Sequence, residues 1–99
     1  MQRTLVQYKA KPDKVAENTA LIERVFEELR MSAPGDVRYL VLRLDDGSFL
    51  HFAEWADGAP GLPALEAFRI FQSGHGERRL EPPARATPTI VGHYRMLSE

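Results

Sequence analysis

The chain lacks cysteine, shows no excess of charge of either sign and contains no long apolar run. Without cysteine it forms no disulfide bond, thiolate metal site or cysteine nucleophile. No stretch approaches the roughly 18 apolar residues of a membrane-spanning helix, and the N-terminus has no signal-peptide core, so we expect a cytoplasmic protein without membrane association. The 13 basic and 14 acidic side chains argue against a nucleic-acid binder held by phosphate contacts.

The length of 99 residues suits one domain, residues 1–99. A domain of this size buries only roughly 60 to 65% of its unfolded surface, so its stability is marginal. We therefore expect a partner chain.

The first half of the chain predicts a strand and a long helix. Residues 3–10 alternate weakly between apolar and polar side chains, which suits a strand. Pro12 and Asp13 follow, a proline and an acid that are typical of the first turn of a helix. Apolar residues then recur at intervals of three and four as far as Leu29, and residues 32–35 end the helix.

The rest of the chain predicts a hairpin, a shorter helix and a last strand. Residues 37–44 and 48–55 are strand runs joined by a turn containing Asp46-Gly47. A second helix contains Leu62, Leu65, Phe68 and Phe71, and residues 73–76 break it. Residues 87–97 predict the final strand, and Pro88 indicates that this strand lies at the edge of the sheet.

This order of elements is strand, helix, strand, strand, helix, strand. It predicts an α+β fold of ferredoxin-like, split βαβ type (βαββαβ), in which a four-stranded antiparallel sheet carries both helices on one face.

Both faces of the predicted hairpin are largely apolar. One row of its first strand is Leu40, Leu42 and Leu44, and the other begins Val37, Tyr39 and Val41. Two helices cover only one face, and an uncovered face of an antiparallel sheet is normally polar. We therefore predict a homodimer formed by sheet-to-sheet packing, although such an apolar surface also marks ligand grooves.

Several short motifs accompany the element order. Lys11-Pro12-Asp13 precedes the first helix, residues 49–55 read Phe-Leu-His-Phe-Ala-Glu-Trp, and Ser73 and His75 lie late in the second helix. Over about residues 2–97 the chain resembles the antibiotic biosynthesis monooxygenase-like domains of the dimeric α+β barrel superfamily. The resemblance implies a dimer with a small-molecule pocket between sheet and helices. Relatives include cofactor-free oxygenases of phenols and quinols, haem-degrading enzymes and stress-associated proteins, so membership does not define the chemistry.

The chain departs from parts of the family pattern. Haem-degrading members have an asparagine on the first strand and a tryptophan on the second helix, whereas this chain has Gln7 and no helical tryptophan. These departures argue against haem, and we expect no cofactor. Phe71 stands where the family usually has a histidine, which indicates an altered pocket.

Two histidines are the candidate catalytic residues. His75 lies between two glycines, where backbone can approach a ligand and an imidazole can act as acid, base or hydrogen-bond donor. It could equally belong to a surface loop that breaks the helix. His51 lies within an apolar strand row, where it is either a core or interface residue or a pocket base.

Aromatic residues are the candidate substrate-binding groups. They are Trp55, Tyr8, Tyr39 and Phe71. Trp55 has a structural alternative as a core residue, and tyrosine is common in strands in any case. None of the three histidines lies within three to five residues of another, so we expect no metal site.

Two functions remain from the sequence. The first is a cofactor-free monooxygenase acting on a small aromatic or quinol-type compound, which needs only one base and a dry apolar pocket. The second is a non-catalytic dimer that binds a small hydrophobic ligand or has a structural role, such as a stress-associated protein of unknown role.

Overall fold

The computed structural model describes residues 1–96, and its main elements follow the predicted order. The strands are β1 (Gln2–Lys9), β2 (Val37–Arg43), β3 (Ser48–Trp55) and β4 (Ala84–Ala86). The helices are α1 (Val15–Ser32), α2 (Glu66–Gln72) and α3 (His75–Arg78), and 3-10 turns at Pro12–Lys14 and Leu62–Ala64 precede α1 and α2. The predicted ferredoxin-like α+β fold is confirmed.

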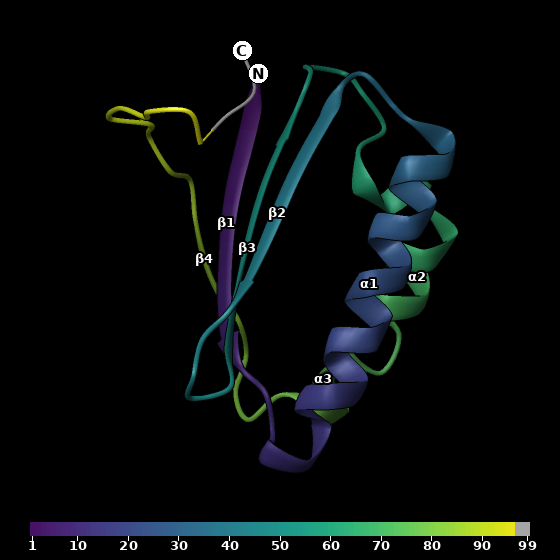
Figure 1. Ribbon diagram of the computed structural model, residues 1–99, viewed down its shortest axis with the longest axis vertical. Helices are drawn as coiled ribbons and strands as arrows, with labels where there is room; N and C mark the ends of the chain where they lie inside the picture. The colour runs from purple at the N-terminus through teal and green to yellow at the C-terminus, as the bar shows by residue number, and fades with distance from the viewer. Residues whose placement is uncertain (97–99) are drawn as a thin grey trace.

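The four strands form one antiparallel sheet in the order β2-β3-β1-β4. Helices α1 and α2 lie side by side on the same face of this sheet (Figure 1). Gly47, at φ +87°, completes the tight turn between β2 and β3, as the Asp46-Gly47 pair predicts. No helix among residues 1–96 is long and apolar enough to cross a membrane.

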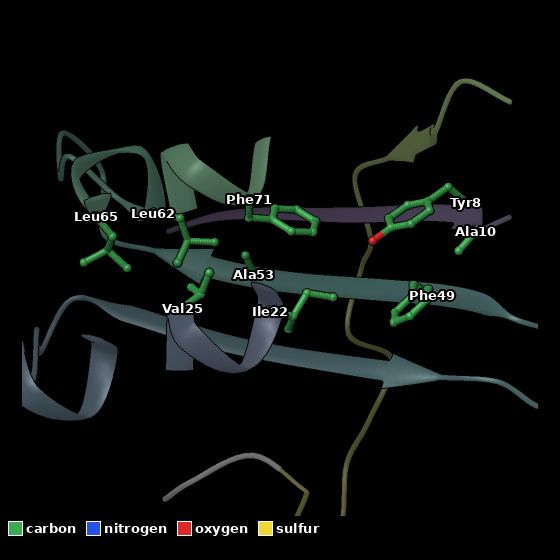
Figure 2. Packing of buried hydrophobic residues seen from close by; sticks show 9 residues of the cluster. All are labelled: Tyr8, Ala10, Ile22, Val25, Phe49, Ala53, Leu62, Leu65 and Phe71. Atoms are coloured by element: carbon green, nitrogen blue, oxygen red, sulfur yellow. The ribbon is translucent and has the colours of Figure 1, made fainter. Parts of the chain in front are cut away.

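The core lies between the sheet and the helices (Figure 2). Helix α1 buries Asn18, Ile22 and Val25, which are spaced four and three residues apart and therefore share one helical face. Strand β3 contributes Phe49, of which only 1% is exposed. Polar side chains are also buried in this layer: Asn18 is completely buried, and His51 and Arg78 are 7% and 4% exposed.

The last strand is shorter and earlier than predicted. Strand β4 covers Ala84–Ala86 and pairs with Leu5 to Gln7 of β1, whereas the prediction was residues 87–97. Within that predicted range, residues 87–96 contain no strand, and Leu97 lies outside the described residues. Pro88 cannot donate to a strand ladder, and most apolar side chains beyond it are exposed, Val91 by 99%. The last strand does lie at the edge of the sheet, as predicted, but Pro88 is not part of it.

The face of the sheet opposite the helices is apolar, as the alternation predicts. Leu40, Leu42 and Leu44 are 42%, 48% and 41% exposed. The strand register aligns Leu40 with Phe52, and Phe52 with Leu5, so a continuous apolar row crosses three strands. We call this surface, defined by Leu5, Leu40, Leu42, Leu44, Leu50 and Phe52, the open face. Arg3 and buried Glu54 form an ion pair of 2.5 Å at one end of it.

Candidate functional site

A small cavity lies between the helix-covered face of the sheet and helices α2 and α3. Its volume is about 90 Å³, and apolar side chains provide most of its wall. Both predicted catalytic residues, His51 and His75, line it, and so do Tyr8, Tyr39 and Phe71. A larger depression of about 440 Å³ beside the β2–β3 turn contains no histidine or tyrosine, so we place the candidate site in the smaller cavity.

The strand register explains how three of these side chains meet. Tyr8 lies opposite Phe49, and Tyr39 lies opposite Ala53. Phe49 and Ala53 are the residues two before and two after His51 on the same face of β3. The two tyrosines are therefore diagonal neighbours of His51 on the two adjacent strands, a separation that aromatic side chains span.

Both ring nitrogens of His51 are hydrogen bonded to tyrosine hydroxyls. The hydroxyl of Tyr8 is 2.9 Å from Nε2, and the hydroxyl of Tyr39 is 2.6 Å from Nδ1. His51 is only 7% exposed. The hydrogen bonds satisfy a ring that burial would otherwise leave with unpaired polar atoms.

Two residues that the sequence did not single out extend this network. Asn18 of α1 donates from Nδ2 to the Tyr8 hydroxyl at 2.8 Å, and Arg78 of α3 donates from Nε to Asn18 Oδ1 at 3.0 Å. Arg78 is buried and also donates to the backbone carbonyl oxygens of Phe71 and Ser73. A cation at the C-terminal end of α2 complements the helix dipole. We call the chain Arg78, Asn18, Tyr8, His51 and Tyr39 the relay.

His75 approaches the cavity from the start of α3. Gly74, at φ +77°, reverses the chain between α2 and α3. Arg79 donates from Nη1 to His75 Nδ1 at 2.8 Å, whereas His75 Nε2 is buried without a hydrogen-bond partner among the described residues. The rings of Tyr8 and His75 meet edge to face, with centroids 4.5 Å apart.

The two histidines and two tyrosines of the cavity are neutral near pH 7. Burial, and then the proximity of His75, lowers the pKa of His51 to about 4. Burial is the largest cause that lowers the pKa of His75 to about 4, and the positive charges of Arg79, Arg78 and Arg85 contribute to the same decrease. Burial raises the pKa of Tyr8 to about 12 and raises that of Tyr39 further.

Trp55 is the one predicted substrate-binding residue that does not line the cavity. It is half-buried and lies at the end of β3. It packs beside Gly61, where a Cβ atom, if one were added, would be 3.8 Å from Trp55 Cγ. This position fits the alternative interpretation, in which Trp55 is a core residue. No group of three histidine, aspartate or glutamate side chains among residues 1–96 is arranged to hold a metal ion.

Asn18 and Arg78 were missed for different reasons. The sequence carries a signal for Asn18, since it is a polar residue in the apolar stripe of α1. Arg78 carries none, because an arginine beside Glu77 and Arg79 at the end of a helix normally faces solvent.

Comparison with known proteins supports the fold. No protein-family model matches the sequence, and no curated protein matches it. Among solved structures, Rv0793 from Mycobacterium tuberculosis has a TM-score of 0.72 and 17% identity, covering 92% of this chain and 95% of its own.

Two further structures carry the name antibiotic biosynthesis monooxygenase provisionally. The one from Nitrosomonas europaea has a TM-score of 0.71 and 18% identity, over 90% of this chain and 88% of its own. The one from Bacteroides thetaiotaomicron has a TM-score of 0.76 and 12% identity, over 98% and 95%. The chain therefore has the fold to which the sequence motifs pointed.

Proposed function

We propose that this chain, which shares the fold of antibiotic biosynthesis monooxygenases, is a cofactor-free monooxygenase acting on a small aromatic or quinol-type compound. The observation that carries the proposal is that His51 and His75 line one largely apolar cavity together with Tyr8, Tyr39 and Phe71. The largely apolar wall of such a cavity limits the water around a bound ring, and its few polar groups orient that ring.

The chemistry needs no metal or flavin if the substrate supplies the electrons. A deprotonated, electron-rich ring carbon reacts with dioxygen directly. In a balanced monooxygenation of a phenol to a quinone, a ring C–H group becomes a carbonyl and one oxygen atom of dioxygen enters the product. The other oxygen atom leaves as water with the hydrogens of that ring carbon and of the phenol hydroxyl. The protein deprotonates the substrate, holds it and keeps water away from the reactive anion.

His75 is the proposed base, but only in a rearranged state. A guanidinium cannot accept a hydrogen bond, so His75 Nδ1 carries no proton while Arg79 donates to it. Release of Arg79 would let the proton move to Nδ1 and leave the Nε2 lone pair for the substrate. Because both nitrogens of His51 are bonded to tyrosines, the proposal assigns His51 a positioning role.

The same hydrogen bonds favour a second candidate, a non-catalytic protein that binds a small ligand. In the arrangement described, neither histidine offers a free lone pair to the cavity. A binding protein needs none.

Oxygen consumption separates the two candidates. Purified protein treated with a chelator is incubated with single-ring quinols and phenols, and oxygen uptake is followed beside a protein-free control. The monooxygenase proposal expects uptake that His75→Ala abolishes and that His93→Ala, an exposed residue outside the cavity, retains. Binding of these compounds without enzyme-dependent uptake would select the non-catalytic candidate.

We propose in addition that two copies pack through their open faces. Exposed Leu40, Leu42 and Leu44 support this, because a monomer rarely leaves such a row in water. Sedimentation at micromolar concentration should give twice the mass of one chain, and the mass of a single chain would refute the dimer. The cytoplasmic location remains a prediction from the sequence.

A further inference from the structure

The relay contains one more proton than its own hydrogen bonds use. Arg78 only donates, so the oxygen of the Asn18 amide faces Arg78 and the NH2 group faces Tyr8. Two bonds remain, Tyr8 to His51 and His51 to Tyr39. Neutral His51 carries one proton and each tyrosine carries one, so three protons serve two bonds.

The surplus proton belongs to a tyrosine that lines the cavity. If Tyr8 donates to His51 Nε2, then Nδ1–H donates to Tyr39, and the hydroxyl proton of Tyr39 is left over. The opposite tautomer leaves the proton of Tyr8. The positive charge of Arg78 favours the first arrangement, in which every donor points away from it.

His75 provides a second unused donor in the same cavity. Because Arg79 donates to Nδ1, the proton of the neutral ring is on Nε2. This N–H is buried and has no hydrogen-bond partner among the described residues. A buried donor without a partner is costly, and a ligand oxygen would satisfy it.

The charges around the cavity have one sign. Arg85 lines the cavity, and Arg78 and Arg79 lie close enough to lower the pKa of His75. No carboxylate is among the described lining residues. The carboxylates of Glu17 and Glu77 interact electrostatically with Arg78, but neither residue lines the cavity. This environment favours a negative charge on a bound ligand.

The volume limits the size of that ligand. An apolar cavity of about 150 Å³ accommodates benzene. The cavity here is smaller, about 90 Å³, but partly open, so it admits at most one ring, part of which extends through the opening, and it excludes fused ring systems.

We propose that the cavity binds the oxyanion of a single-ring aromatic compound, held by the hydroxyl of Tyr39 and the Nε2–H of His75, with Arg78 as the positioning residue that directs the relay. This inference rests on the proposed ligand cavity but not on oxygen chemistry. It specifies that the ligand of this cavity is negatively charged. It also assigns a role to Asn18 and Arg78, two residues that contact no ligand themselves.

The test uses 4-nitrophenol, whose ionised form absorbs visible light and whose neutral form does not. At a pH equal to the pKa of the free compound, binding should increase the ionised fraction. We expect about a tenfold preference for phenolate over phenol, equivalent to a decrease of about one unit in the pKa of the bound phenol. The methyl ether 4-nitroanisole, which cannot ionise, should bind about tenfold more weakly than the phenolate, and benzoate should compete.

Three variants test the assigned donors. Tyr39→Phe and His75→Phe should each weaken phenolate binding by about fivefold to tenfold and leave binding of 4-nitroanisole unchanged, consistent with the loss of one hydrogen bond to a charged group. Arg78→Met should shift the optical pKa of bound 4-nitrophenol back toward its free value. Tyr94→Phe, which alters an exposed tyrosine outside the cavity, is the matched control.

The inference is overturned if bound 4-nitrophenol shows an unchanged or raised pKa, or if Tyr39→Phe and His75→Phe bind phenolate as the parent does. Should Arg78→Met fail to fold, these two variants still decide the matter. Phenolate preference without oxygen uptake refutes only the monooxygenase proposal, whereas oxygen uptake without phenolate preference refutes only this inference.

Discussion

The two faces of the sheet differ in which side chains they bury and which they leave exposed. On the face beneath the helices, buried Tyr8 and His51 and half-buried Tyr39 are paired through hydrogen bonds. On the open face, apolar Leu40 and Leu42 remain exposed in the single chain. The helices of the same chain cover the first face, whereas residues 1–96 leave these leucines of the second face exposed, and the dimer proposed above would cover them with a second copy. Residue type alone therefore does not reveal which face of the sheet holds the candidate site.

The largest expected effect compares the same residue type on the two faces. Phe49→Ala removes a fully buried ring and should lower the free energy of unfolding by about 3 to 5 kcal/mol at every protein concentration. Phe52→Ala lies on the open face and should act mainly by weakening association, so its effect should grow with protein concentration. Urea unfolding at several concentrations measures both. Equal, concentration-independent losses would remove the distinction between the faces.

Acid should lower the free energy of unfolding through His51, which lies on the helix-covered face of the sheet. The pKa of His51 is about 4 in the folded chain and 6.5 in a model peptide. Between these values the unfolded chain binds more protons, so stability rises with pH, and it falls as the pH is lowered from 6.5 to 4. His51 alone contributes a loss of about 3 kcal/mol.

Urea unfolding at pH 7, 5 and 4 measures this loss. His51→Phe removes the titrating group, so its free energy of unfolding should decrease less over the same pH range. Its stability at pH 7 should be lower than that of the parent, because two tyrosines lose their hydrogen-bond partner. His93→Gln alters a histidine outside the cavity and serves as the control. If His51→Phe retained the parental pH dependence, the loss would originate elsewhere, for example in carboxylates.

Breaking the relay should have a smaller effect. Asn18→Ala leaves buried Arg78 without one acceptor and the Tyr8 hydroxyl without one donor, and should lower the free energy of unfolding by about 1 to 3 kcal/mol. Gln7→Ala removes an exposed amide from the other face of β1 and should change stability by less than about 0.5 kcal/mol. Thermal unfolding of the pair compares them, and equal effects would argue against a structured relay.

The smallest expected effect concerns His75. Arg79→Met removes a nearby positive charge and should raise the pKa of His75, which is about 4, toward its ordinary value. The pKa should remain below that value because burial is the larger cause. Proton NMR titration of the imidazole measures it, with Arg95→Met, an exposed arginine outside the cavity, as the control. An unchanged pKa would show that Arg79 does not act on the ring.

The sequence predicts those elements that local patterns determine. The spacing of apolar residues predicts α1, the Asp46-Gly47 turn predicts the hairpin, and Gly74 marks the break after α2. The second apolar face also follows from alternation alone. Alternation does not distinguish a strand from an extended, exposed segment, which is why residues 87–96 were assigned incorrectly.

The relay could not be predicted because it is not local. Arg78 and Asn18 are 60 residues apart, and no pattern in a single sequence joins them. The histidines and tyrosines were predicted from residue type and from the resemblance, but their convergence depends on the strand register and on the position of α3.

The diagonal arrangement of Tyr8, His51 and Tyr39 also bears on how the sheet forms. Side chains alternate between faces, so a slip of one residue in either strand pairing would move a tyrosine to the opposite face. A misaligned sheet would then bury His51 with an unpaired nitrogen, at a free-energy cost that the aligned sheet avoids. The three side chains that line the cavity would therefore also favour the correct strand pairing during folding.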